Sequence, residues 1–120
     1  LGKYYIVDIG LRNFLLGKNS DIGRLLENIV FLELLRRNYR VYIGKIDNTE
    51  VDFIAEKNDE RIYFQVSETI LGEETKFREL RPLKMIKDSY EKIILTMDDV
   101  FLGCDDTGIK HKNIIEWLME

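Results

Sequence analysis

Three polar side chains on two predicted strands form the strongest candidate for a functional cluster. Successive side chains of a strand point to opposite faces of a sheet. When the segments Glu50–Glu56 and Arg61–Thr69 pair as a hairpin, Asp52, Gln65 and Ser67 therefore share one face and leave the other face apolar. The spacing predicts a polar cluster of a carboxylate, an amide and a hydroxyl. The alternative for Asp52 is an ion pair with a nearby Lys or Arg.

A further carboxylate, Glu27, is predicted on the longest helix, which runs from about 21 to 37. Apolar residues occupy nearly its whole circumference, which indicates a helix packed on more than one side. Glu27 falls between Phe31 and Leu34 in helical projection. A carboxylate surrounded by apolar side chains needs a cationic or hydrogen-bonding partner, a metal ion or an opening to water. Glu27 is thus a candidate fourth member of the cluster, or it bridges to a basic residue at the helix edge.

A run of basic residues follows within a helix predicted from about Glu73 to Lys87, and Glu79 is the only acid between positions 76 and 87. Such a run can follow the phosphates of a nucleic acid. The alternative is a solvated helix face. The net charge of −4 argues against strong duplex binding, and aromatic residues at core spacing argue against base stacking. The basic residues are Lys76, Arg78, Arg81, Lys84 and Lys87.

The elements that must position these residues predict an α/β fold. With 120 residues, of which 45% are hydrophobic, the chain can form one compact domain. From Asp21 to Met97 the order is αβββαβ, which predicts a mixed β-sheet flanked by helices. Pro82 is expected to kink or break its helix near Leu80, and Asn113 to cap a last helix. The remaining elements are strands at Lys3–Val7, Arg40–Lys45 and Ile93–Leu95, a short helix at Asp8–Gly17 and a turn at Asp47-Asn48.

Composition and motifs exclude several classes of protein. The single cysteine, Cys104, excludes an intramolecular disulfide and a cysteine zinc cluster. His111 is the only histidine and is expected in a turn or at the surface, and no spacing indicates a hydrolase triad. There is no P-loop motif, no apolar run that spans a bilayer and no secretory signal, so a cytoplasmic location is expected. Because the chain begins without Met inside a predicted strand, we expect a fragment of a larger protein.

Taken in order, the motifs resemble the restriction-endonuclease-like, or PD-(D/E)XK, nuclease superfamily. They are Glu27 on a first helix, Glu50-Val51-Asp52 on a strand and Gln65-Val66-Ser67 after a hairpin. Shorter matches along nearly the whole chain resemble one branch, an uncharacterised domain found C-terminal to P-loop ATPase modules in bacteria and archaea. The resemblance implies a single domain over residues 1–120, an upstream ATPase domain in the same polypeptide as a partner, and DNA as a possible ligand.

The resemblance also implies a metal site. In active members an Asp, a following Glu or Gln and often a helical Glu hold Mg²⁺, and these positions are Asp52, Gln65 and Glu27 here. Mg²⁺ takes oxygen ligands, activates a water and stabilises charge on the phosphate. The catalytic lysine should stand two residues after Gln65, where this chain has Ser67. A neutral hydroxyl supplies no positive charge beside the phosphate.

Three hypotheses follow from the presence of Ser67 where the resemblance expects a lysine. The leading one is a degenerate nuclease-like domain that binds nucleic acid or protein, with weak or no catalysis. The second is an active metal-dependent DNA nuclease whose lysine comes from elsewhere, with Lys76 as the nearest candidate. The third is a purely structural interaction domain in which the cluster is vestigial.

Overall fold

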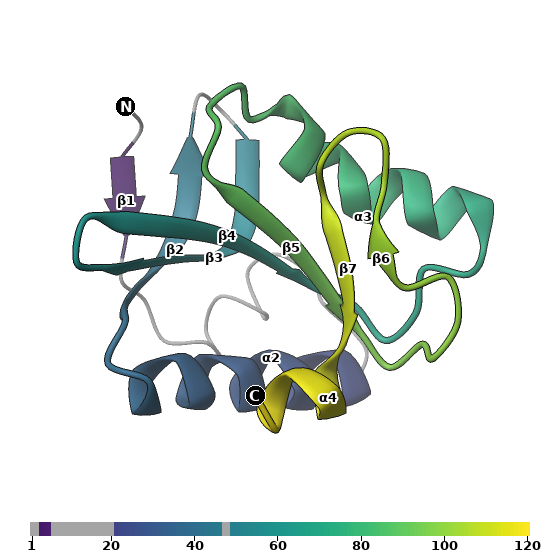
Figure 1. Ribbon diagram of the computed structural model, residues 1–120, viewed down its shortest axis with the longest axis horizontal. Helices are drawn as coiled ribbons and strands as arrows, with labels where there is room; N and C mark the ends of the chain where they lie inside the picture. Colours follow the sequence, from purple (N-terminus) through teal and green to yellow (C-terminus); the bar gives the residue numbers. More distant parts are fainter. Residues whose placement is uncertain (1–2, 6–20, 47–48) are drawn as a thin grey trace.

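The computed structural model describes residues 3–5, 21–46 and 49–120. The described strands form one sheet in the order β1-β2-β3-β4-β5-β7-β6, with helices on both faces (Figure 1). Strands β1 to β4 pair antiparallel, β5 pairs parallel with β4 and β7, and β6 pairs antiparallel with β7. The predicted mixed sheet flanked by helices is confirmed, and the order αβββαβ runs from α2 to β5. The elements are β1 (Lys3–Tyr5), α2 (Asp21–Arg36), β2 (Arg40–Ile46), β3 (Thr49–Lys57), β4 (Glu60–Val66), α3 (Glu73–Met85), β5 (Glu91–Thr96), β6 (Gly103–Cys104), β7 (Lys110–Asn113) and α4 (Ile114–Leu118).

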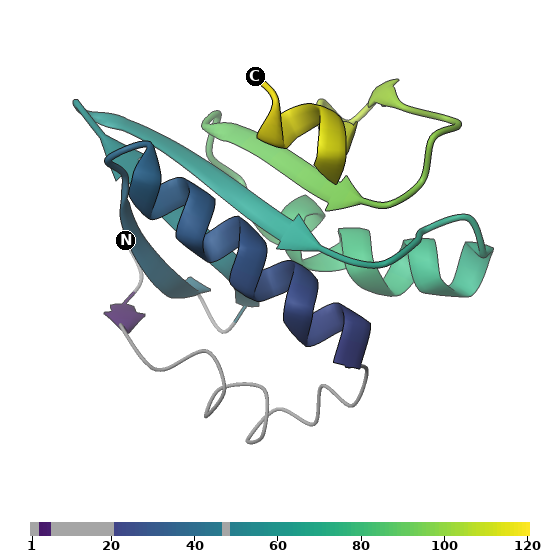
Figure 2. The ribbon, with the colours of Figure 1, turned by 90° about the horizontal axis from the view of Figure 1, so that it is seen from below.

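Each face of the sheet has its own apolar core. Helices α2 and α4 cover one face of the sheet (Figures 1 and 2). On that face Leu26 and Val30 of α2 pack with Phe53 and Phe64 of the sheet. Helix α3 covers the other face, where it buries Ile54 completely. Both faces are apolar because both carry helices, and the polar cluster is confined to one end of the hairpin.

The side chains of β3 alternate between the two faces of the sheet except at one point. The register between β2 and β3 shifts between Tyr42 and Gly44, so that three steps on β3 oppose two steps on β2. Such a bulge re-aims the side chains around it. As a result Val51 packs in the α3 core together with Ile54, although alternation places it with Phe53. Asp52 lies inside this bulge.

Other predicted boundaries differ in ways that have local causes. Strand β4 ends at Val66 and not at Thr69, because the next residues turn to bind the Asp98 carboxylate through Thr69 Oγ1 (2.6 Å) and the Ile70 N–H (2.9 Å). Helix α3 continues through Pro82 to Met85, so the predicted break does not occur. Because proline has no N–H, the carbonyl four residues before Pro82 loses its helical donor. That carbonyl belongs to an exposed residue, so water can replace the missing N–H.

The amino-terminal predictions are covered only in part. The strand predicted over Lys3–Val7 is described as β1, Lys3–Tyr5. The helix predicted over Asp8–Gly17 and the turn at Asp47-Asn48 lie outside the described residues. The predicted cap of the last helix is confirmed, because the Asn113 side chain accepts a hydrogen bond from the Glu116 N–H. None of the described helices has the length and apolar composition that a membrane span requires.

An arginine joins the two helices that share one face of the sheet. Arg37 donates from Nη2 to the Trp117 carbonyl (2.6 Å), and its guanidinium lies over the Trp117 ring, 4.4 Å from the centroid. The same arginine and Arg36 donate hydrogen bonds to the Glu33 carboxylate. These bonds, first from Arg36 and then from Arg37, lower the pKa of Glu33 to about 2.

We expect Glu33→Gln to reduce the sensitivity of the fold to acid. The carboxyl has an ordinary pKa of 4.5 and a folded value of about 2, so its contribution to stability is complete above pH 4.5 and is lost as the pH falls toward 2. The free energy of unfolding from urea titrations between pH 6 and pH 2 should therefore fall less in the variant than in the wild type. Glu60→Gln, at an exposed position in the β3–β4 hairpin, is the control and should follow the wild type. Parallel pH profiles for all three proteins would contradict the assignment.

Candidate functional site

Asp52 and Gln65 lie opposite each other where the β3–β4 ladder ends. The last backbone pair is Phe53 with Phe64. Beyond it the Asp52 N–H donates to Gln65 Oε1 (2.7 Å), and the Val66 N–H donates to Asp52 Oδ2 (2.8 Å). The two side chains thereby satisfy backbone donors of the opposite strand, which buried N–H groups require. We call this pair the Asp52–Gln65 clasp.

The clasp is enclosed between the two helical layers. Asp52 is 2% exposed and Gln65 is 6% exposed. The Gln65 amide also donates to the Glu79 carbonyl (3.3 Å), which ties the clasp to α3. From the other layer comes Glu27, 1% exposed, in the amino-terminal half of α2. Helix α2 lies on the face of the sheet opposite α3 (Figures 1 and 2), whereas the Gln65 amide binds α3.

The hydrogen bonds of the clasp occupy oxygen atoms that the resemblance assigns to a Mg²⁺ site. Asp52 Oδ2 and Gln65 Oε1 each accept a backbone N–H already. Mg²⁺ requires near-octahedral geometry and usually keeps several waters. Binding of a hydrated Mg²⁺ ion would therefore require these two oxygens to share or give up their backbone hydrogen bonds.

Ser67 stands just past the end of β4, at the position where the resemblance expects a lysine. Its N–H donates to the Leu95 carbonyl (3.0 Å), which continues the pairing of β4 with β5 for one residue. Its hydroxyl donates to the Thr69 carbonyl (2.9 Å) in the turn that follows. The side chain therefore serves a local turn, while Asp52 and Gln65 are brought together without it.

The basic residues of α3 divide between two sides of the helix. Arg78 and Arg81 line a groove beside β2 and β3, whereas Lys76 lines a separate pocket beside β5 and β7. Lys84 is close enough to the β6–β7 turn to influence Asp105. Against the effect of burial, hydrogen bonds within that turn and the Lys84 charge lower the pKa of Asp105. The sequence run therefore does not form one continuous basic surface.

The groove that contains Arg78 and Arg81 has a volume of about 750 Å³, and we call it the α3 groove. Lys45 of β2 lines its opposite wall, and Phe77 of α3 is 69% exposed at its surface. The same helix provides the Glu79 carbonyl that binds Gln65, and Glu79 directly follows Arg78. It combines three cations with an exposed aromatic ring. The residues that line it are Lys45, Thr49, Glu50, Glu74, Phe77, Arg78, Arg81, Pro82 and Met85.

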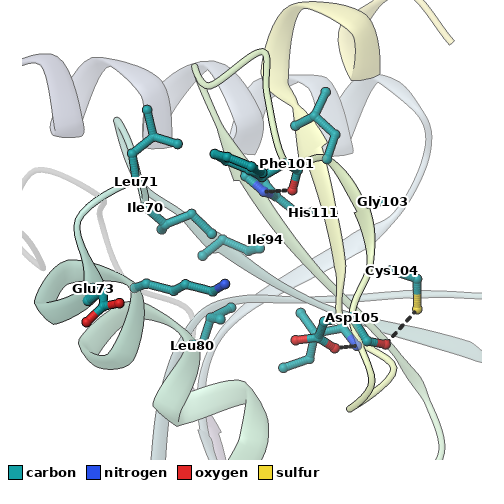
Figure 3. A pocket seen from close by; sticks show the side chains of 13 residues that line it. Ile70, Leu71, Glu73, Leu80, Ile94, Phe101, Gly103, Cys104, Asp105 and His111 are labelled. Carbon is teal, nitrogen blue, oxygen red and sulfur yellow. Dashed lines mark hydrogen bonds between the residues drawn. The ribbon is translucent and has the colours of Figure 1, made fainter.

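A second pocket, of about 350 Å³, lies between α3, β5 and the segment that leads into β6 (Figure 3). Its wall includes His111, which is buried on β7. His111 Nδ1 lies 3.1 Å from the Phe101 carbonyl, which can only accept, so Nδ1 donates there. His111 Nε2 lies 2.7 Å from the Thr96 hydroxyl and 3.8 Å from Asp98 Oδ2. The predicted surface position of His111 is wrong, because β7 carries this residue into the sheet. Cys104 is exposed at the pocket rim.

Residues 22–114 match the family described as a domain of unknown function, DUF4143. The chain belongs to the DUF4143 family. It is 44% identical over 119 residues to an uncharacterized protein of Haemophilus influenzae, a match that covers 98% of this chain and 29% of the relative. It is 38% identical over 106 residues to an uncharacterized protein of Methanocaldococcus jannaschii, with 83% and 22% covered. The chain therefore spans less than a third of the length of these relatives.

In this DUF4143 domain, sequence reasoning places Asp52 and Gln65 together but misses two residues of the α3 groove. Lys45 lies one residue before the end of β2, a strand that shows no functional motif, and its place in the groove depends on the packing of α3 across β2 and β3. Phe77 has a signal in the sequence. It lies three positions after Glu74 and four before Arg81, hence on the polar stripe of the helix and not on its core stripe.

Proposed function

We propose that this DUF4143 chain is a nuclease-like binding domain without metal-dependent catalysis, which binds nucleic acid through the α3 groove. The proposal includes a restriction-endonuclease-like ancestry, a cytoplasmic location and an ATPase domain upstream in the same polypeptide. The αβββαβ core, and a clasp at the positions where that superfamily holds its metal, support the ancestry. The greater length of the relatives supports a larger polypeptide.

The observation that carries the proposal is the composition of the α3 groove. Lys45 and Arg81 face it from a strand and a helix, so a bound chain of phosphates would have a cation on each wall. Glu50 and Glu74 also line the groove and offset part of this positive charge. Arg78 adds a third cation, which shares its charge with Glu79 at 3.6 Å. Lys and Arg that neutralise phosphates supply most of the affinity in sequence-independent binding.

The exposed ring of Phe77 favours single strands over duplexes. A phenyl face binds a base by stacking only when that base is free of its neighbours, as in single-stranded DNA or RNA. In a duplex the base faces are already stacked. Because the whole chain carries a charge of −4, binding is expected to be weak and strongly dependent on salt.

Fluorescence anisotropy with a labelled single strand and the matching duplex tests the proposal. At about 50 mM salt we expect wild-type protein to bind the single strand more tightly. Arg81→Ala should weaken binding to both and lower the salt slope by about 1, as expected for a lost phosphate contact. Phe77→Ala should weaken single-strand binding about tenfold or more and leave duplex binding unchanged.

Arg40→Ala is the matched control, because Arg40 is an exposed arginine on β2 outside the groove lining. It should bind like the wild type. No binding of either nucleic acid at low salt would overturn the proposal and favour a purely structural interaction domain. Cleavage of the probe in the presence of Mg²⁺ would instead favour the active nuclease.

A further inference from the structure

Helix α2 carries large apolar side chains on the side that faces away from the sheet, with the exposed Asn28 among them. Its inner residues Leu26, Val30 and Leu34 pack in the core, whereas Ile22, Leu25, Leu32 and Leu35 are each about half exposed. Figure 2 looks onto α2 from this outer side. A helix that is apolar on both sides normally packs on both. A row of large apolar side chains at the surface of a small domain marks an interaction site.

The apolar residues on the outer side of α2 are placed symmetrically about the middle of the helix. Ile22 and Leu35 lie equally far from the midpoint between Asn28 and Ile29, and Leu25 and Leu32 form a second symmetric pair. Ile22 and Leu25 lie three positions apart, as do Leu32 and Leu35, and Leu25 and Leu32 lie seven positions apart, so all four fall on one side of the helix.

The charged residues of α2 follow the same symmetry with opposite signs. Asp21 corresponds to Arg36, and Arg24 corresponds to Glu33. Within the helix they already form ion pairs, Asp21 with Arg24 near one end and Glu33 with Arg36 near the other. A reversed copy of α2 therefore places apolar residues against apolar residues and acids against bases.

We propose that this outer stripe is a dimer interface, in which α2 packs antiparallel against α2 of a second copy of the chain. A twofold axis through the midpoint of the helix generates such a contact, because it brings the same patch of both copies together. Leu25 then faces the partner's Leu32, and each acid–base pair lies beside the complementary pair of the other copy. A parallel arrangement would instead set Asp21 against Asp21 and Arg36 against Arg36, with like charges opposed.

Sedimentation equilibrium of the full chain tests the interface. We expect wild type to be a dimer, and Leu25→Glu to weaken dimerisation by about 30-fold or more, the effect of losing a central apolar contact. The matched control is Leu71→Glu, because Leu71 is 54% exposed, close to the 57% of Leu25, and lies outside α2. It should dimerise like the wild type. Far-ultraviolet circular dichroism establishes that both variants are folded.

The antiparallel register has a separate test that does not depend on weakened binding. In a Cys104→Ser background, a mixture of Leu25→Cys and Leu32→Cys chains should form a disulfide-linked dimer on mild oxidation. Each variant alone should form it far more slowly. Preferential linking of Leu25→Cys with itself would overturn the antiparallel arrangement. A chain that stays monomeric at the highest concentrations would overturn the proposal. Another part of a longer polypeptide or a different protein would then be expected to cover the stripe.

Discussion

Replacement of Asp52 by Ala is expected to lower the free energy of unfolding by about 3 kcal/mol, and for a domain of this size the melting temperature by roughly 10 °C. The Val66 N–H donates to Asp52 Oδ2 in a region that is almost fully buried. Without the carboxylate this donor has no acceptor in the clasp, and a buried unsatisfied group is costly. Gln65 would hold the other half of the clasp alone. Urea titration monitored by circular dichroism measures the loss.

The variant Asp52→Asn distinguishes a hydrogen-bonding role of Asp52 in the clasp from a role as a metal ligand. Asn keeps an oxygen that can accept from Val66, so we expect it to lose less than half of what Ala loses. A carboxylate gathered with others to hold an ion behaves in the opposite way, because its removal usually leaves stability unchanged or raised. Calorimetric titration with Mn²⁺ should give no saturable binding to the wild type. Saturable binding that disappears in Asp52→Asn would contradict the clasp and restore the metal site.

The parts of the fold that could be predicted are those with strong local patterns. The strands β2, β3 and β4 follow from runs of β-branched and aromatic residues between turn residues, and α2 follows from its apolar periodicity. The meeting of Asp52 with Gln65 follows from alternation once the two strands are paired as a hairpin. These features depend on neighbours in the sequence.

The parts that could not be predicted depend on distant partners. Strand β7 contains Lys110, His111, Lys112 and Asn113, which carry no strand signal by composition, and it exists because β5 pairs with it in parallel register. The burial of His111 follows from that pairing. The split of the basic run into two sides likewise depends on where α3 crosses the sheet, which the sequence of the helix alone does not determine.

The bulge that holds Asp52 is a further feature that alternation does not predict, and Gly44 on the neighbouring strand explains it. A Cβ at position 44 would lie 2.5 Å from Ile54 Cδ1 and 2.7 Å from Val51 Cγ2. Both residues are fully buried, so neither can move aside into solvent. Because Val51 and Ile54 flank the bulge, the absence of a side chain at Gly44 lets both pack on the same face.

Gly44→Ala is therefore expected to destabilise the protein by about 3 kcal/mol, at the upper end of what overpacking a core costs. Ile54→Val removes Cδ1, the nearest of the clashing atoms, so Gly44→Ala should cost about 1 kcal/mol less in that background, as contacting residues show in double-mutant cycles. Gly72→Ala is the control, because the nearest atom to its Cβ is Thr75 Oγ1 at 3.9 Å, and it should change stability little.

The cycle separates a local clash from a general effect of removing a glycine. Additive losses in Gly44→Ala and Ile54→Val would mean that Gly44 does not act through the bulge. Coupled losses would mean that it does, and the clasp should then respond as well. Once Gly44→Ala has disturbed the bulge, the Asp52 carboxylate no longer reaches Val66 as before, so Asp52→Ala should cost less in the Gly44→Ala background than in the wild type. The glycine on β2 would in that case determine where the Asp52 side chain points, although it makes no hydrogen bond to the clasp through a side chain of its own.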